Sequence, residues 1–150
     1  MNDEIFQMME LSQQGFYCSQ ILLMMGLKAQ GKTNPDLIRS MAGLAGGIGF
    51  CGKNCGSLTG GACLLSLYAS RGTAEEVEDE RLRKMILDLV EWFVAKYSPI
   101  YGGIDCSIIY GGDLTKKKER CPQIILQTYQ QVKEILRING FDMSGKGAGA

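Results

Sequence analysis

Histidine is absent from this chain of 150 residues. Its absence removes the usual general base of hydrolytic catalysis and the commonest partner of a nucleophilic cysteine. It also excludes zinc sites that need paired histidines and haem sites that need an axial histidine. Any metal in this protein would therefore be held mainly by thiolate sulfur.

An excess of charge of one sign is missing as well. The chain has 16 Lys and Arg residues and 16 Asp and Glu residues, so its formal net charge is zero. No overall field draws it to nucleic acid or to an anionic membrane, and neither is expected as a partner. The short charged runs at 75–80 and 116–120 are predicted to be solvated surfaces.

Long uninterrupted apolar runs are also lacking. The most apolar stretch, 41–69, contains Lys53, Asn54 and many glycines, which argues against a membrane span. Residues 1–10 are acidic and amphipathic, so no secretory signal is expected. These features predict a cytoplasmic protein, in which stable disulfides are uncommon. Its six cysteines are therefore expected to be thiols, metal ligands or a switching redox pair.

Apolar residues recur at helical spacing along the chain, and no alternating strand pattern is present. The predicted helices cover about 3–14, 19–28, 35–45, 56–70, 73–98 and 121–139. Residues 99–120 are predicted to be a loop with one short turn after Cys106. We expect an all-α fold, a bundle of five or six helices with a glycine-rich cysteine loop. It would form one domain over 1–140, followed by a disordered tail over 141–150.

The most unusual segment is 46–56, in which five of eleven residues are glycine and which contains Cys51 and Cys55. Glycine permits positive φ and lets backbone N–H groups approach a sulfur atom or a cluster closely. The helix expected to begin at Gly56 adds partial positive charge, which lowers the pKa of a nearby thiol. The alternative is a tight helix crossing with two buried thiols. The glycines predicted to bind a cofactor are Gly47, Gly49, Gly52 and Gly56.

The other cysteines lie in varied settings. Cys121 precedes Pro122 at a predicted helix start, so the same lowering of its pKa is expected. Cys106 lies in a loop close to two glycines. From the residues alone, Cys18 and Cys63 fit best as buried small hydrophobes.

These settings predict an order of reactivity in the metal-free protein. The thiolate is the nucleophile, so thiols at helix starts should react first. Cys55 and Cys121 are therefore expected to react before Cys63, which lies in an apolar helix interior.

Four ordered segments carry a family resemblance: 15–22 around Cys18, 46–49 with 55–60, Cys106 with 112–114, and Cys121. Together they resemble the bacterial and archaeal family of redox-active proteins named for a C_GCAxxG_C_C cysteine pattern. The resemblance extends from Gly15 to about Leu136. The family pattern has Gly-Cys-Ala where this chain has Cys-Gly-Ser at 55–57. The chain is also similar to the cluster-bearing part of split-Soret cytochromes c, although it has no Cys-x-x-Cys-His haem site.

The resemblance implies redox activity and an iron–sulfur centre without haem. It makes Cys18 a site residue, so the redox-active thiols are expected to be Cys18, Cys55, Cys106 and Cys121. The predicted metal ligands are Cys51, Cys55, Cys106 and Cys121, with Cys18 as a fifth candidate for four positions. Cys51 and Cys63 lie outside the four-cysteine family pattern.

Three functions stay open at this point. The first is electron transfer or redox sensing through an iron–sulfur cluster with cysteine ligands only. The second is thiol–disulfide chemistry that begins at Cys55 or Cys121, and the third is a structural zinc site. We expect an electron carrier rather than a hydrolase or transferase, with an oxidoreductase activity left open. The expected partner is a redox protein, and a homodimer is left open.

Overall fold

The computed structural model describes residues 3–145, which form seven α-helices and one 3₁₀-helix and contain no β-strand. This confirms the predicted all-α bundle. The additional helix, α6, is the short turn expected after Cys106. In chain order the elements are α1 Asp3–Gln13, α2 Cys18–Ala29, α3 Pro35–Met41, η1 Ala42–Leu44, α4 Gly56–Ala69, α5 Leu82–Tyr101, α6 Cys106–Ile109 and α7 Leu114–Ile138.

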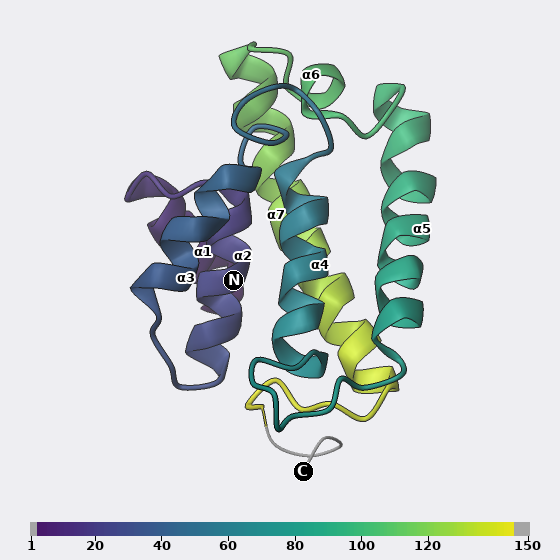
Figure 1. Ribbon diagram of the computed structural model, residues 1–150. Helices are drawn as coiled ribbons and strands as arrows, with labels where there is room; N and C mark the ends of the chain where they lie inside the picture. Colours follow the sequence, from purple (N-terminus) through teal and green to yellow (C-terminus); the bar gives the residue numbers. More distant parts are fainter. Residues whose placement is uncertain (1–2, 146–150) are drawn as a thin grey trace.

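Helix α4 occupies the middle of the bundle and packs against α2, α5 and α7 (Figure 1). Its glycines permit this close packing. A β-carbon on Gly60 would lie 3.0 Å from the Cα atom of Ser19 in α2. A β-carbon on Gly61 would lie 3.0 Å from side-chain atoms of Leu89 and Thr128. The small residues of α4 thus let three helices approach it at once.

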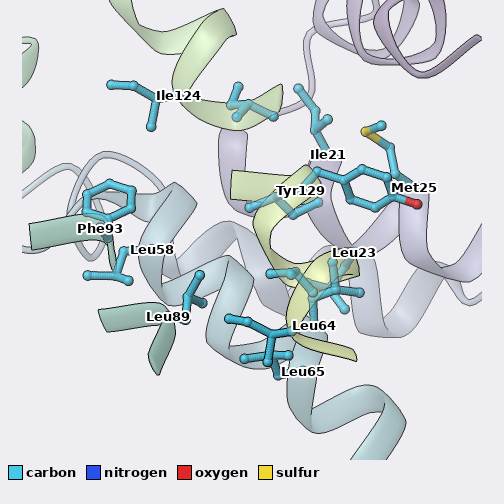
Figure 2. Close-up of a cluster of buried hydrophobic side chains, with 14 of the residues drawn as sticks. Ile21, Leu23, Met25, Leu58, Leu64, Leu65, Leu89, Phe93, Ile124 and Tyr129 are labelled. Atoms are coloured by element: carbon cyan, nitrogen blue, oxygen red, sulfur yellow. The ribbon is translucent and has the colours of Figure 1, made fainter. Parts of the chain in front are cut away.

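A continuous apolar core fills the space between these helices, and Figure 2 shows part of it. Its members include Leu64 and Leu65 of α4, Leu89 and Phe93 of α5, and Val132 of α7, all fully buried. Burying a side chain of this size contributes on the order of 1.5–3 kcal/mol to stability. The core therefore fixes the positions of the helices relative to one another.

The start of α5 differs from the prediction. The sequence places a capping box at Thr73 with Glu76, but the helix begins only at Leu82. The Glu76 carboxylate instead accepts a hydrogen bond from the backbone N–H of Gly72 at 2.6 Å. Residues 73–81 therefore form a connection rather than the first turns of a helix.

Two prolines lie inside helices that the sequence predicts to end or begin beside them. Helix α5 continues past Pro99, and α7 begins at Leu114, seven residues before Cys121. The carboxylate of Asp113 caps α7 by accepting the backbone N–H groups of the second and third residues after it. Pro122 removes one ladder hydrogen bond, the one to the carbonyl of Lys118, and both residues are exposed. The predicted helix start at Cys121 is therefore wrong.

The predicted tail is partly described. Phe141 and Met143 pack against the core, and the Tyr68 hydroxyl donates a hydrogen bond to the Met143 carbonyl at 2.6 Å. Residues 146–150 of that predicted tail lie outside the described residues. No helix within residues 3–145 combines the length and the apolar character needed to cross a bilayer.

Candidate redox site

Four cysteines from separate parts of the chain line one cavity of about 370 Å³. Cys18 is the first residue of α2, and Cys55 immediately precedes α4. Cys106 is the first residue of α6, and Cys121 lies in the third turn of α7. The cavity lies at the end of the bundle where α6 and the loop before α4 meet, at the top of Figure 1.

Burial raises the pKa of all four thiols. It is the main cause that raises the pKa of Cys55 to about 12. It likewise raises the pKa of Cys18 to about 11 and that of Cys121 to about 11, and it raises the pKa of Cys106. Mutual repulsion between thiolates adds to the effect and connects every pair of the four. Each thiol thus lies within electrostatic range of the other three.

Nearby backbone N–H groups oppose part of this effect at two of the thiols. Those of Ser19 and Gly46 lower the pKa of Cys18 against the larger effect of burial. Those of Ser57 and Leu58 at the start of α4 act on the pKa of Cys55 in the same way, although the Cys55 side chain does not cap the helix. This is the stabilisation of a thiolate that the helix start at Gly56 predicts, but desolvation outweighs it.

A short backbone clamp fixes Cys55 next to Cys106. The N–H of Cys55 donates to the Ile104 carbonyl at 3.1 Å, and the N–H of Cys106 donates to the Lys53 carbonyl at 2.7 Å. Between them, Asn54 and Asp105 form an isolated antiparallel bridge. Two cysteines far apart in sequence are therefore held in place by main-chain hydrogen bonds.

The loop before α4 contains five consecutive residues with positive φ, from Gly46 to Phe50. Two of them, Ile48 at 64° and Phe50 at 63°, are not glycine. The left-handed region is costly for such side chains. A β-carbon on Gly47 would lie 2.4 Å from the backbone N and O atoms of Lys53, so this position accepts only glycine without rearrangement.

The predicted cofactor-binding glycines have different placements. Gly56 lines the cavity, whereas Gly47, Gly49 and Gly52 do not. Gly47 and Gly52 instead shape the loop through their positive φ and close backbone contacts. Gly46 is not among the predicted glycines, but it lines the cavity, and its backbone N–H lowers the pKa of Cys18.

Cys51 and Cys63 lie outside the cavity. Cys51 is exposed, and its Sγ atom donates only to the Gly49 carbonyl at 3.8 Å. Cys63 is half-buried in α4, and burial raises its pKa. The structure therefore argues against the predicted order of reactivity, because Cys55 is more deeply buried than Cys63 and Cys121 does not lie at a helix start.

The sequence analysis missed the residues at the mouth of the cavity. Lys117 and Lys118 line it, although the run 116–120 is predicted only as a solvated surface. Lys117 lowers the pKa of both Cys106 and Cys121 against the effect of burial. A helix that starts at Leu114 places Lys117 four residues before Cys121, on the same helix face. The signal in the sequence was Asp113: read as a capping residue, it would have placed the start of this helix at Leu114.

Comparison with known sequences agrees with this arrangement. Residues 16–135 match the family described as "Putative redox-active protein (C_GCAxxG_C_C)". The chain belongs to this family. The matched range includes all four cavity cysteines. No curated protein and no solved structure matches the chain. Membership of the C_GCAxxG_C_C family makes the chain a redox-active protein in the general sense of the family description.

Proposed function

We propose that Cys18, Cys55, Cys106 and Cys121 bind an iron–sulfur cluster, and that the chain uses it for electron transfer or redox sensing. The observation that carries the proposal is the convergence of these four thiols on one cavity. The cavity lining contains no carboxylate or imidazole donor among residues 3–145. A donor set made of thiols alone suits iron–sulfur clusters and other soft metals. When bound, such a cluster supplies reversible one-electron chemistry.

We prefer a cluster to a single zinc ion as the bound group. Tetrahedral zinc with bonds of about 2.3 Å needs its four sulfur atoms about 3.8 Å apart. Within residues 3–145, no group of three or more Cys, Asp or Glu side chains is gathered closely enough to hold one metal ion. A polynuclear cluster joins thiolates over wider separations than one zinc ion does, which is why we propose it for thiols that surround a cavity. Cys18 replaces Cys51 in the proposed ligand set because Cys51 lies outside the cavity.

Groups around the cavity partly compensate the negative charge that four thiolates would have. Burial is the main cause of their raised pKa values, and repulsion between thiolates adds to it. Backbone N–H groups near Cys18 and Cys55 lower the pKa values of these thiols, and Lys117 and Arg120 act in the same direction on Cys121. Hydrogen bonds to ligand sulfur atoms are one of the means by which proteins tune a cluster's potential.

The thiol–disulfide alternative has less support. A reactive thiol needs a substantial thiolate fraction near neutral pH and access to solvent. Cys55 has neither, because it is buried and its pKa is raised to about 12. Cys121, the other expected nucleophile, has its pKa raised to about 11.

Anaerobic purification followed by metal analysis tests the proposal. We expect iron and acid-labile sulfide in matching amounts, with a broad visible absorption that bleaches on reduction. Stoichiometric zinc without iron would contradict the proposal and support the structural zinc site. A colourless, metal-free chain that cannot be loaded with iron and sulfide, but reacts reversibly with a disulfide, would instead support thiol–disulfide chemistry.

A further inference from the structure

We propose that the mouth of the cysteine cavity is a docking surface for an acidic region of a partner protein. This inference rests on the proposed redox function, because it names the kind of partner that would reach the site. The surface consists of Tyr17, Phe50, Leu114, Lys117 and Lys118, all of which line the cavity. We call it the rim surface.

Three large apolar side chains of the rim surface are exposed beside the cavity. The exposed fraction is 41% for Tyr17, 62% for Phe50 and 63% for Leu114. The rings of Tyr17 and Phe50 meet edge to face with centroids 5.2 Å apart. Single exposed apolar residues are ordinary, but a group at the opening of a functional cavity is typical of an interaction site. Aromatic residues are also enriched in protein interfaces.

Phe50 lies at the rim in a backbone conformation that is unfavourable for a residue other than glycine. Its φ of 63° is in the left-handed region, where non-glycine residues are uncommon. In the isolated chain this conformation is not compensated by burial, since most of the side chain is exposed. Unfavourable backbone conformations of this kind are concentrated at binding and catalytic sites. The loop thus presents an aromatic ring to the outside beside the four thiols.

Charge at the rim specifies an acidic partner. Lys117 and Lys118 are the only charged residues among the described residues that line the cavity. The nearest carboxylates in sequence are those of Asp113 and Glu119, and neither lines it. Asp113 is engaged in capping α7. A partner with carboxylates around an apolar centre would therefore complement the rim surface in both respects.

A second copy of this chain fits the rim surface less well. Two copies joined rim to rim by a two-fold axis would bring four lysines together. The acidic run 75–80 lies beyond the other end of α4, where the N–H of Asp79 donates to the Ala69 carbonyl. Fourteen residues of helix separate the two ends, about 21 Å. Pairing this run with the rim would join copies head to tail, which makes rings or open chains rather than a two-fold dimer.

Binding to two small electron-transfer proteins of opposite charge tests the inference. The anaerobically purified full chain is titrated into fluorescently labelled flavodoxin, as the acidic probe, and into labelled cytochrome c, as the basic probe. We expect anisotropy to show binding to flavodoxin that weakens about tenfold or more from about 20 mM to about 200 mM salt. We expect no comparable binding to cytochrome c. Carbodiimide, which joins amines to carboxylates, should cross-link flavodoxin at Lys117 and Lys118.

Matched variants identify the surface. K117E/K118E should weaken flavodoxin binding about tenfold or more, whereas K28E/K32E, with the same change in net charge on the α2–α3 side, should not. L114S should weaken binding without changing its salt dependence. Equal binding to both probes, equal effects of the two charge reversals, or cross-links elsewhere would overturn the inference. Reductive titration separates the two proposals: a wild-type chain that takes up no electrons overturns the redox function, whatever the docking result.

Discussion

Gly56 lies directly against the thiol of Cys18: a β-carbon at residue 56 would stand 2.5 Å from the Cys18 Sγ atom and 3.1 Å from the Leu44 carbonyl oxygen. These separations are too short for an added methyl group, and both neighbours lie in the packed end of the bundle. Gly56→Ala should therefore displace the Cys18 thiol from the cavity. Through the proposed ligand role of Cys18, this contact connects local packing with cofactor binding.

For Gly56→Ala we expect the free energy of unfolding to fall by about 1–3 kcal/mol, the usual cost of overpacking. The iron content should fall by more than the decrease in the folded fraction of the protein. Urea unfolding and metal analysis give the two values. Gly43→Ala is the matched control, because a β-carbon at residue 43 meets nothing within 4 Å. Equal iron content in the two variants would show that Gly56 does not position a ligand.

Relief of backbone strain at Ile48 should stabilise the protein. Its φ is 64° and about half of its side chain is exposed, so little packing is lost on substitution. Ile48→Gly should gain about 0.5–1 kcal/mol, because relief of about 1–2 kcal/mol of strain exceeds the entropic cost of glycine. Leu87→Gly, at a half-exposed position inside α5, should instead lose about 1 kcal/mol. If urea unfolding shows that both substitutions destabilise the protein, the strained left-handed conformation at Ile48 is contradicted.

Timed alkylation of the reduced, metal-free protein should follow access and thiolate fraction. Exposed Cys51 should react first, and half-buried Cys63 should precede Cys55. A pKa of about 12 leaves almost no Cys55 thiolate near pH 7, and the fraction grows about tenfold for each unit that the pH rises. Peptide mass spectrometry at two pH values gives the order. Early labelling of Cys55 would mean that the cavity opens readily in solution.

The sequence is informative about fold wherever local and tertiary signals agree. The apolar stripes of α5 and α7 predict the bundle, and the structure packs those residues together. The start of α7 was mistaken because Pro122 resembles a first helical residue. The actual capping residue, Asp113, precedes it by nine positions, and the loss of one exposed hydrogen bond does not stop the helix.

The candidate site is less accessible to sequence reasoning. The residues alone single out Cys51 and Cys55, and Cys18 enters the predicted site only through the family resemblance. Burial decides which thiols converge, and no local pattern shows that Cys51 points outward while Cys55, four residues later, is buried. The clamp between Cys55 and Cys106 is formed by main-chain groups, which carry no sequence signature.

The most direct test of the account is the iron content of cysteine-to-alanine variants purified without oxygen, with circular dichroism to confirm that each is folded. The double variant C51A/C63A should retain the iron, sulfide and visible spectrum of the wild-type chain, because neither thiol lines the cavity. The single variants C18A, C55A, C106A and C121A should each lose most of the iron. Loss of iron from folded C51A/C63A, or full retention by any folded member of the other four, would contradict the four-thiol site.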